Sequence, residues 1–365
     1  MPSQSDQILE LIAVAGEFPT AALRRLPIKE SYRYKLMADL KEKKLIRLYT
    51  RDGLRGYRIT AKARDSLMTF RPERFEFFLT GNAETNKRLT DYKRRLRLHH
   101  TAEVAVTLSN IGIAFYPDEK PTLFSETLQA ASKPSEVAFY FSREMKNIGL
   151  EHLKIRSSRA AGVLLAENEM LLTYNSGSNL MRWEYQTEIR CKALLSARFC
   201  KDVATSIYSD ADVNGLMLGT GMDMALPLLT STGGYRRQYF RLDGTFERFY
   251  FAPNTPEGES QIRILCSDSV KSALNNLLLS DLVPKEPGLR VDHDALSNDG
   301  IPILFAFEFD MERLRRFHDS LELFGETGMV YCFDFQKPVL EKYLGTLAGI
   351  QTIDLEKVER RFFST

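Results

Sequence analysis

The stretch SYRYKLMADLKEKKLIRLYTRDGLRGYRIT, residues 31–60, decides how the N-terminal part of the chain folds. Apolar residues recur every four positions in its first half, which predicts a helix over 31–44 with a serine at its N-cap. Strand patterns follow at 45–49 and 56–59, and the Asp-Gly pair between them is a hairpin signal. The stretch therefore predicts a helix followed by a β-hairpin.

The residues on either side extend this pattern to a complete small domain. An apolar helical face covers residues 6–15, and a short helix is expected at 20–26, where Pro27 ends it. A further helix should follow the hairpin at 61–68. Three helices followed by a β-hairpin is the order of a winged helix-turn-helix. We therefore expect such a domain over residues 1–70.

In winged-helix proteins the third helix enters the major groove and the hairpin flanks it on the DNA backbone. Here that helix would present Arg33, Tyr34 and Lys35, and the hairpin would present Arg51 and Arg55. Arginine and lysine suit phosphate contacts, and arginine also reads guanine edges. These five residues are the predicted DNA contacts. A winged helix used only for protein contact or dimerisation is the alternative.

The charge distribution also favours an anionic partner for the front of the chain. The 365 residues carry a net charge of only +2, but the first hundred contain 22 basic and 12 acidic residues. A basic cluster that includes Lys93, Arg94 and Arg95 lies on a predicted long helix within a basic linker region, residues 71–135. This cluster would extend the DNA footprint by phosphate contacts. A solvated helix face is the equally weighted alternative.

Residues 136–365 predict a mixed α/β domain, because apolar strand patterns alternate there with amphipathic helices. A hairpin is expected over 160–174 around a polar turn, and no internal repeat of fixed period is visible. The other predicted strands cover 261–266, 303–309, 329–335 and 350–355, and the predicted helices cover 180–199, 270–279, 311–324 and 338–347.

Several classes of protein are disfavoured by what the sequence lacks. The four cysteines form no C-x-x-C pair and the five histidines have no zinc spacing, so no Cys/His metal site and no cofactor are expected. No phosphate-binding glycine loop, His-hydrophobic-His relaxase motif or serine-hydrolase elbow occurs. No apolar run reaches the ~18 residues of a membrane span. We expect a cytoplasmic protein without a membrane partner.

Carboxylates are the remaining candidates for chemistry. Glu308 and Asp310 have the same parity on an expected strand over 303–310, and Asp334 follows the next strand, as in nucleases that bind Mg²⁺ with strand carboxylates. The E-x-K signature is missing, and Asp310 is well placed to cap the helix that follows. We expect the capping role, so the chain is not expected to be an enzyme.

The N-terminal residues resemble a known family. The runs Ile8 to Leu23, Leu36 to Leu40, Lys43 to Arg47 and Tyr57 to Ala63 look like the winged-helix start of the replication-relaxation family, which is encoded on plasmids and integrative conjugative elements. The resemblance implies a winged helix before a nuclease-like α/β body, of which the restriction-endonuclease-like fold is one form. It also implies an accessory role in replication or transfer, with a relaxase or replication protein as partner.

The leading hypothesis is therefore a protein that binds a specific site on double-stranded DNA, as an accessory factor of a mobile element. A two-fold homodimer would place half-sites about one helical turn apart. Two alternatives stay open. One is a Mg²⁺-dependent DNA nuclease that uses the rear domain, and the other is a transcriptional regulator whose rear domain senses a small ligand.

Overall fold

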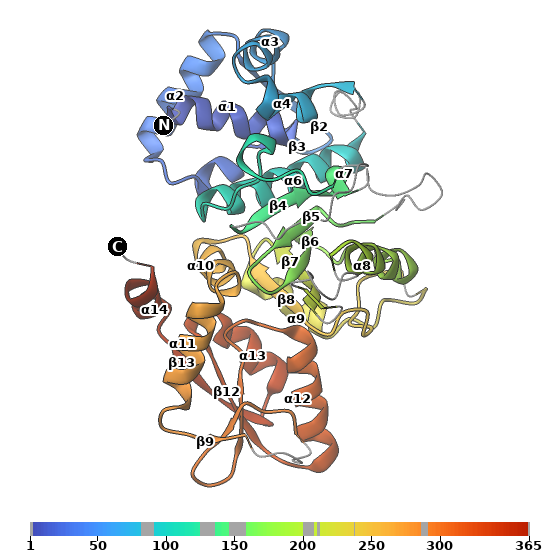
Figure 1. The fold of residues 1–365 in the computed structure, drawn as a ribbon, viewed down its shortest axis with the longest axis vertical. Coiled ribbons are helices and arrows are strands. Elements are labelled where there is room, and N and C mark those ends of the chain that lie inside the picture. Colours follow the sequence, from blue (N-terminus) through green and yellow to red (C-terminus); the bar gives the residue numbers. More distant parts are fainter. Residues whose placement is uncertain are drawn as a thin grey trace. The chain divides into compact units, whose positions relative to one another are not determined.

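A computed structural model gives the fold of the chain (Figure 1). The residues that it describes are 3–81, 91–124, 136–145, 158–199, 208–209, 212–236, 238–285 and 291–363.

The chain forms two compact units. The first comprises residues 1–125 and 138–141, and the second comprises 126–137 and 142–365. The sequence predicts a separate linker region over residues 71–135. In the structure, residues 71–124 belong to the first unit instead. The physical reason is that helix α6 (Tyr92–Asn110) packs against helix α1 (Gln4–Ala15) and supplies part of the same core.

The first unit is built around a small antiparallel sheet with the strand order β1-β3-β2. The elements of this unit are α1 (Gln4–Ala15), β1 (Phe18–Pro19), the 3₁₀ helix η1 (Ala22–Arg25), α2 (Glu30–Glu42), β2 (Ile46–Arg51), β3 (Leu54–Ile59), α3 (Ala61–Phe70), α4 (Pro72–Leu79), α6 (Tyr92–Asn110), η2 (Pro117–Glu119) and β4 (Ala138–Phe141).

The helices and the hairpin expected within residues 1–70 lie near their expected bounds. The helix predicted at 31–44 begins at Glu30 after Lys29, so the expected serine N-cap at residue 31 is wrong. The strands 18–19 and 138–141 and the helices 72–79 and 117–119 are additional to the sequence expectations.

Local chemistry explains where these elements begin and end. Ser3 and Asp6 form a capping box at the start of α1, and Gly16 ends that helix with a φ of 78°, which glycine adopts without steric cost. The side chain of Thr60 caps α3. Between β2 and β3, Asp52 and Gly53 both have positive φ, as the predicted hairpin turn requires.

The second unit contains the expected mixture of helices and strands. Its elements are α7 (Ser142–Met145), β5 (Gly162–Leu165), β6 (Met170–Gly177), α8 (Tyr185–Phe199), β7 (Val213–Gly219), η5 (Met222–Met224), α9 (Ala225–Leu229), β8 (Phe249–Pro253), α10 (Pro256–Leu265), α11 (Asp268–Leu279), β9 (Val283–Pro284), β10 (Ala295–Leu296), β11 (Pro302–Phe305), α12 (Met311–Phe324), β12 (Gly328–Phe333), η6 (Asp334–Gln336), α13 (Lys337–Leu344), β13 (Ala348–Ile353) and α14 (Leu355–Phe362).

Two sheets of the second unit repeat one connectivity. In the first of these sheets, β5 and β6 pair antiparallel, and β7 and then β8 join as parallel strands. In the second, β10 and β11 pair antiparallel, and β12 and then β13 join as parallel strands. Helices follow the second, third and fourth strand in both cases. The sheets meet where β8 contacts the turn after β11, because the Phe251 amide donates to the Phe309 carbonyl oxygen at 3.1 Å.

Two strand predictions in this unit are wrong. The stretch 261–266 is the end of α10 and the residue that follows it, because Thr255 caps a helix there with Pro256 in its first turn. The expected strand 303–309 ends at Phe305, a turn follows, and Phe309 has a φ of 54°. Glu308 and Asp310 therefore do not share a strand face, since the alternation on which that expectation rested stops before them.

No helix within the described residues is long and apolar enough to cross a membrane.

Candidate functional sites

Four of the predicted DNA-contacting residues in the first 70 positions are exposed. On α2, Tyr34 is 65% exposed and Lys35 is exposed. At the tip of the β2–β3 hairpin, Arg51 and Arg55 are exposed on either side of the turn. The side chains of Lys35 and Arg55 have no hydrogen-bond or ion-pair partner among the described residues, so their charges face solvent.

The fifth residue, Arg33, is buried, and its assignment as a DNA contact is wrong for this structure. Its Nη1 atom donates to the carbonyl oxygen of Leu23 at 3.2 Å, which ties α2 to η1. The helical period turns positions 33, 36, 37 and 40 toward the core, while 34 and 35 point outward. Arg33 thus stabilises the arrangement of the two helices.

Arg95 is also wrongly assigned, because it is completely buried. Its Nη2 atom donates to Glu17 at 2.6 Å and to the carbonyl oxygen of Leu54 at 3.0 Å, and its Nη1 atom donates to the carbonyl oxygen of Arg51. Arg95 therefore anchors both ends of the hairpin turn to α6. The neighbouring Lys93 and Arg94 are exposed, so they stay in the predicted set.

Glu17 is the centre of this buried network. It accepts hydrogen bonds from Arg95 and Arg58, and its Oε1 lies 2.8 Å from Nε2 of His99. Burial alone would raise the pKa of Glu17, but these three partners outweigh it and hold the pKa at about 2. A side chain on Gly56 would come within 2.7 Å of Glu17, so glycine is required for this close approach.

A second group of ionisable side chains lies in the second unit, and we call Glu169, Arg248, Tyr250, Lys271 and Glu308 the Glu308 cluster. Glu169 Oε1 accepts from the Tyr250 hydroxyl at 3.0 Å and from Arg248 Nη1 at 3.3 Å. Lys271 Nζ lies 3.7 Å from the same oxygen atom. The charges of Lys271, Glu169 and Arg248 all act on Glu308.

Four separate segments bring the cluster together. Glu169 ends the turn between β5 and β6, and Glu167 in the same turn accepts a hydrogen bond from the Asp268 amide at the start of α11. That contact sets the turn beside Lys271, which lies in the first turns of α11. Arg248 directly precedes β8, Tyr250 lies in its first residues, and Glu308 lies in the turn after β11.

Glutamine side chains hold the turn that carries Glu308. Gln261 Nε2 donates to the carbonyl oxygens of Glu308 and Phe251, each at 2.8 Å. Gln336 Nε2 donates to the Phe307 carbonyl oxygen at 3.0 Å. Phe309 is fully buried in the left-handed region, where a bulky residue is strained, so the surrounding packing fixes this turn.

The cluster shifts the proton equilibria of its members. Burial raises the pKa of Glu308 to about 7, the charge of Glu169 adds to the effect, and Lys271 and Arg248 oppose it. Burial also raises the pKa of Tyr250 well above its usual value, so the phenol keeps its proton. Burial acts to lower the pKa of Lys271, but the neighbouring carboxylates, first Glu169 and Glu308, outweigh it and keep the ammonium charged.

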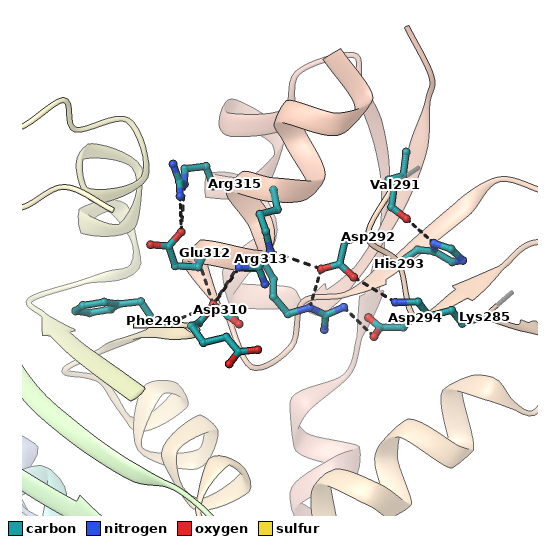
Figure 2. A network of polar contacts seen from close by, with 12 residues as sticks. Phe249, Lys285, Val291, Asp292, His293, Asp294, Asp310, Glu312, Arg313 and Arg315 are labelled. Atoms are coloured by element: carbon teal, nitrogen blue, oxygen red, sulfur yellow. Dashed lines mark hydrogen bonds and ion pairs between the residues drawn. The ribbon is translucent and has the colours of Figure 1, made fainter. Parts of the chain in front are cut away.

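Asp310 caps α12, as expected. Its Oδ1 accepts from the amides of Glu312 and Arg313 at 3.1 and 3.4 Å, and from the Phe249 amide at 3.1 Å. Figure 2 shows Asp310 between Phe249 and the start of α12. Burial nevertheless raises the pKa of Asp310, against the effect of these amides. Its second oxygen, Oδ2, is buried without a hydrogen-bond partner in the described structure.

Further ion pairs fix the start of α12 in place. Arg313 Nη2 lies 2.9 Å from Asp294, and Arg313 Nε lies 3.6 Å from Asp292, which also pairs with Lys285 (Figure 2). The third sequence candidate, Asp334, is exposed and makes no capping hydrogen bond at η6. The Phe333 amide instead donates to Gln336 Oε1 at 2.9 Å. Asp334 makes no hydrogen bond or ion pair with Glu308 in the described structure.

Sequence reasoning missed Glu169, Arg248, Tyr250 and Lys271. Only Glu169 carried a signal, since it belongs to the polar turn of the expected hairpin 160–174.

Comparisons of the chain with protein-family models, with curated proteins and with solved structures found no match.

Proposed function

We propose that the first unit is a winged helix-turn-helix that binds double-stranded DNA, with α2 as the recognition helix and the β2–β3 hairpin as the wing. The observation that carries the proposal is the exposure of Tyr34, Lys35, Arg51 and Arg55 at the two places that such a domain turns toward DNA. The element order α1-β1-η1-α2-β2-β3 and the sheet order β1-β3-β2 support it.

The buried network gives this interface a rigid base. Arg95 holds the two carbonyl groups that flank the wing turn, and Arg33 holds the start of the recognition helix on η1. Pre-positioned side chains lose less conformational entropy on binding, so affinity gains from this arrangement. The exposed Lys93 and Arg94 at the beginning of α6 would add phosphate contacts.

The wider role that we propose is that of a cytoplasmic accessory factor in the replication or transfer of a plasmid or conjugative element. This part rests on the resemblance of residues 8–63 to the replication-relaxation family. A relaxase or replication protein would then be the partner, and a homodimer would read a two-fold site.

The test is a triple variant in which Lys35, Arg51 and Arg55 are changed to alanine. We expect its affinity for duplex DNA to fall at least about tenfold, because three phosphate contacts and their released counterions are lost. The slope of log affinity against log salt should become shallower by about three. Fluorescence anisotropy across a salt series measures both quantities.

The matched control changes Lys342, Lys357 and Arg360 to alanine. These residues are exposed in the second unit, and their loss alters net charge by the same amount. The control should bind DNA as the wild type does. Wild-type affinity and slope in the first triple variant would contradict the proposal.

A further inference from the structure

The Glu308 cluster, together with Asp310, has three carboxyl groups but only two cationic side chains, Lys271 and Arg248. Glu169 Oε2 and Asp310 Oδ2 are buried and have no hydrogen-bond partner in the described part of the chain. The half-buried carboxylate of Glu308 makes no hydrogen bond or ion pair in the same part of the chain. Buried polar groups in native proteins are almost always satisfied, so unpartnered buried oxygens indicate that a donor or a cation belongs beside them.

The cationic side chains nearby do not fill this role. Lys271 is already committed to Asp268, at 3.0 Å, and to Glu169 Oε1. Arg248 Nη1 donates to Glu169 Oε1 and to the Tyr250 hydroxyl, each at 3.3 Å. In the described structure, the contacts of Lys271 Nζ and Arg248 Nη1 are therefore with one oxygen of Glu169 and with neighbouring groups, and none is with Glu169 Oε2, Asp310 Oδ2 or Glu308.

The available donor set selects the kind of cation. All of the unsatisfied atoms are carboxylate oxygens, which suit hard ions such as Mg²⁺ and Mn²⁺. The described residues contain no group of three carboxylate, histidine or cysteine ligands placed to hold an ion directly. Mg²⁺ commonly binds through one or two carboxylates and keeps several waters, and those waters donate hydrogen bonds. A hydrated ion therefore agrees with the absence of three direct ligands among the described residues and with the unpartnered carboxylate oxygens.

We propose that Glu308 binds a hydrated divalent cation of the magnesium type, whose water molecules donate to Glu169 Oε2 and Asp310 Oδ2. The site is prepared before the ion arrives, because Gln261 and Gln336 hold the backbone of the Glu308 turn. This inference concerns the second unit and is independent of DNA binding by the first.

The test is Mn²⁺ binding to the full chain after treatment with a chelator, followed by electron paramagnetic resonance with Mg²⁺ as competitor. We expect one ion per chain in the wild type, with displacement by Mg²⁺. Glu308→Gln should weaken Mn²⁺ binding at least about tenfold. The matched control is Asp334→Asn, which removes an exposed carboxylate of the same unit and should leave Mn²⁺ binding unchanged.

Lys271→Gln provides a second readout that does not depend on loss of folding. The Lys271 ammonium attracts the same carboxylates as the ion and repels the ion itself, so its removal should tighten Mn²⁺ binding. Absence of Mn²⁺ binding in the wild type, wild-type binding in Glu308→Gln, or weaker binding in Lys271→Gln would each overturn the proposal.

Discussion

At the scale of single residues, Glu17 is the centre of a buried ionic network in the first unit. Its carboxylate is completely buried, accepts hydrogen bonds from Arg58 and Arg95, and lies beside His99. Removing one partner of a buried ion pair costs about 3–5 kcal/mol, because the remaining charges stay buried without compensation. This network, rather than the exposed basic residues, fixes the hairpin relative to α6.

We predict that Glu17→Gln lowers the free energy of unfolding by about 3–5 kcal/mol at pH 7. The folded-state pKa of about 2 lies below the ordinary value of 4.5, so ionised Glu17 contributes stability above pH 4.5 that is lost as pH falls toward 2. The difference in free energy of unfolding between wild type and variant should therefore be smaller at pH 3 than at pH 7. Urea unfolding at both pH values measures this difference, and a difference that does not change with pH would contradict the prediction.

At the scale of elements, α6 belongs to the core of the first unit. It packs along α1 and supplies Arg95 and His99 to Glu17. Strand β4 adds Phe141, whose ring contacts Phe78 and Phe115 edge-on. A domain that ends at residue 70 would leave both the apolar face of α1 and the charge of Glu17 uncovered.

We predict that a fragment of residues 1–141 unfolds in a cooperative thermal transition, while a fragment of residues 1–70 shows none or a much lower midpoint. The physical reason is the loss of the α1–α6 packing and of two partners of Glu17. Circular dichroism melts compare the two fragments. Equal midpoints would show that α6 is dispensable.

Local patterns in the sequence predicted most elements near their observed bounds, because caps, turns and periodicity act over a few residues. The hairpin over 160–174, the helix over 311–324 and the hairpin turn after Arg51 are examples. The strand prediction for 261–266 is wrong because a short apolar run fits a strand and a buried helix equally well. Of the Glu308 cluster, only Glu308 itself was identified.

The remaining members of that cluster could not be found by the same means. Glu169 and Lys271 stand 139 and 37 positions before Glu308. Contacts between distant segments bring them together: the Asp268 amide donates to Glu167, and β8 meets the turn after β11. The sequence also does not predict the burial of Arg33 and Arg95, because arginine usually lies at the protein surface. Their partners are a backbone carbonyl and a glutamate from distant segments.

At the scale of the whole molecule, the second unit contains a duplicated topology without a sequence period. The connection from β6 to β7 spans residues 178–212, whereas that from β11 to β12 spans 306–327. Unequal connections remove any fixed spacing, so the repeat appears only in the strand order. The proposed cation site lies where the two sheets meet, and the proposed DNA interface lies in the other unit.

Hydrogen–deuterium exchange of the full chain, with and without duplex DNA at low salt, tests DNA binding by the winged helix most directly. We predict slower exchange on DNA addition in α2 (Glu30–Glu42) and in the hairpin 46–59, with α12 and α13 unchanged. DNA binding by the winged helix would be contradicted if DNA slowed exchange only within residues 142–365, or if DNA slowed exchange nowhere at low salt.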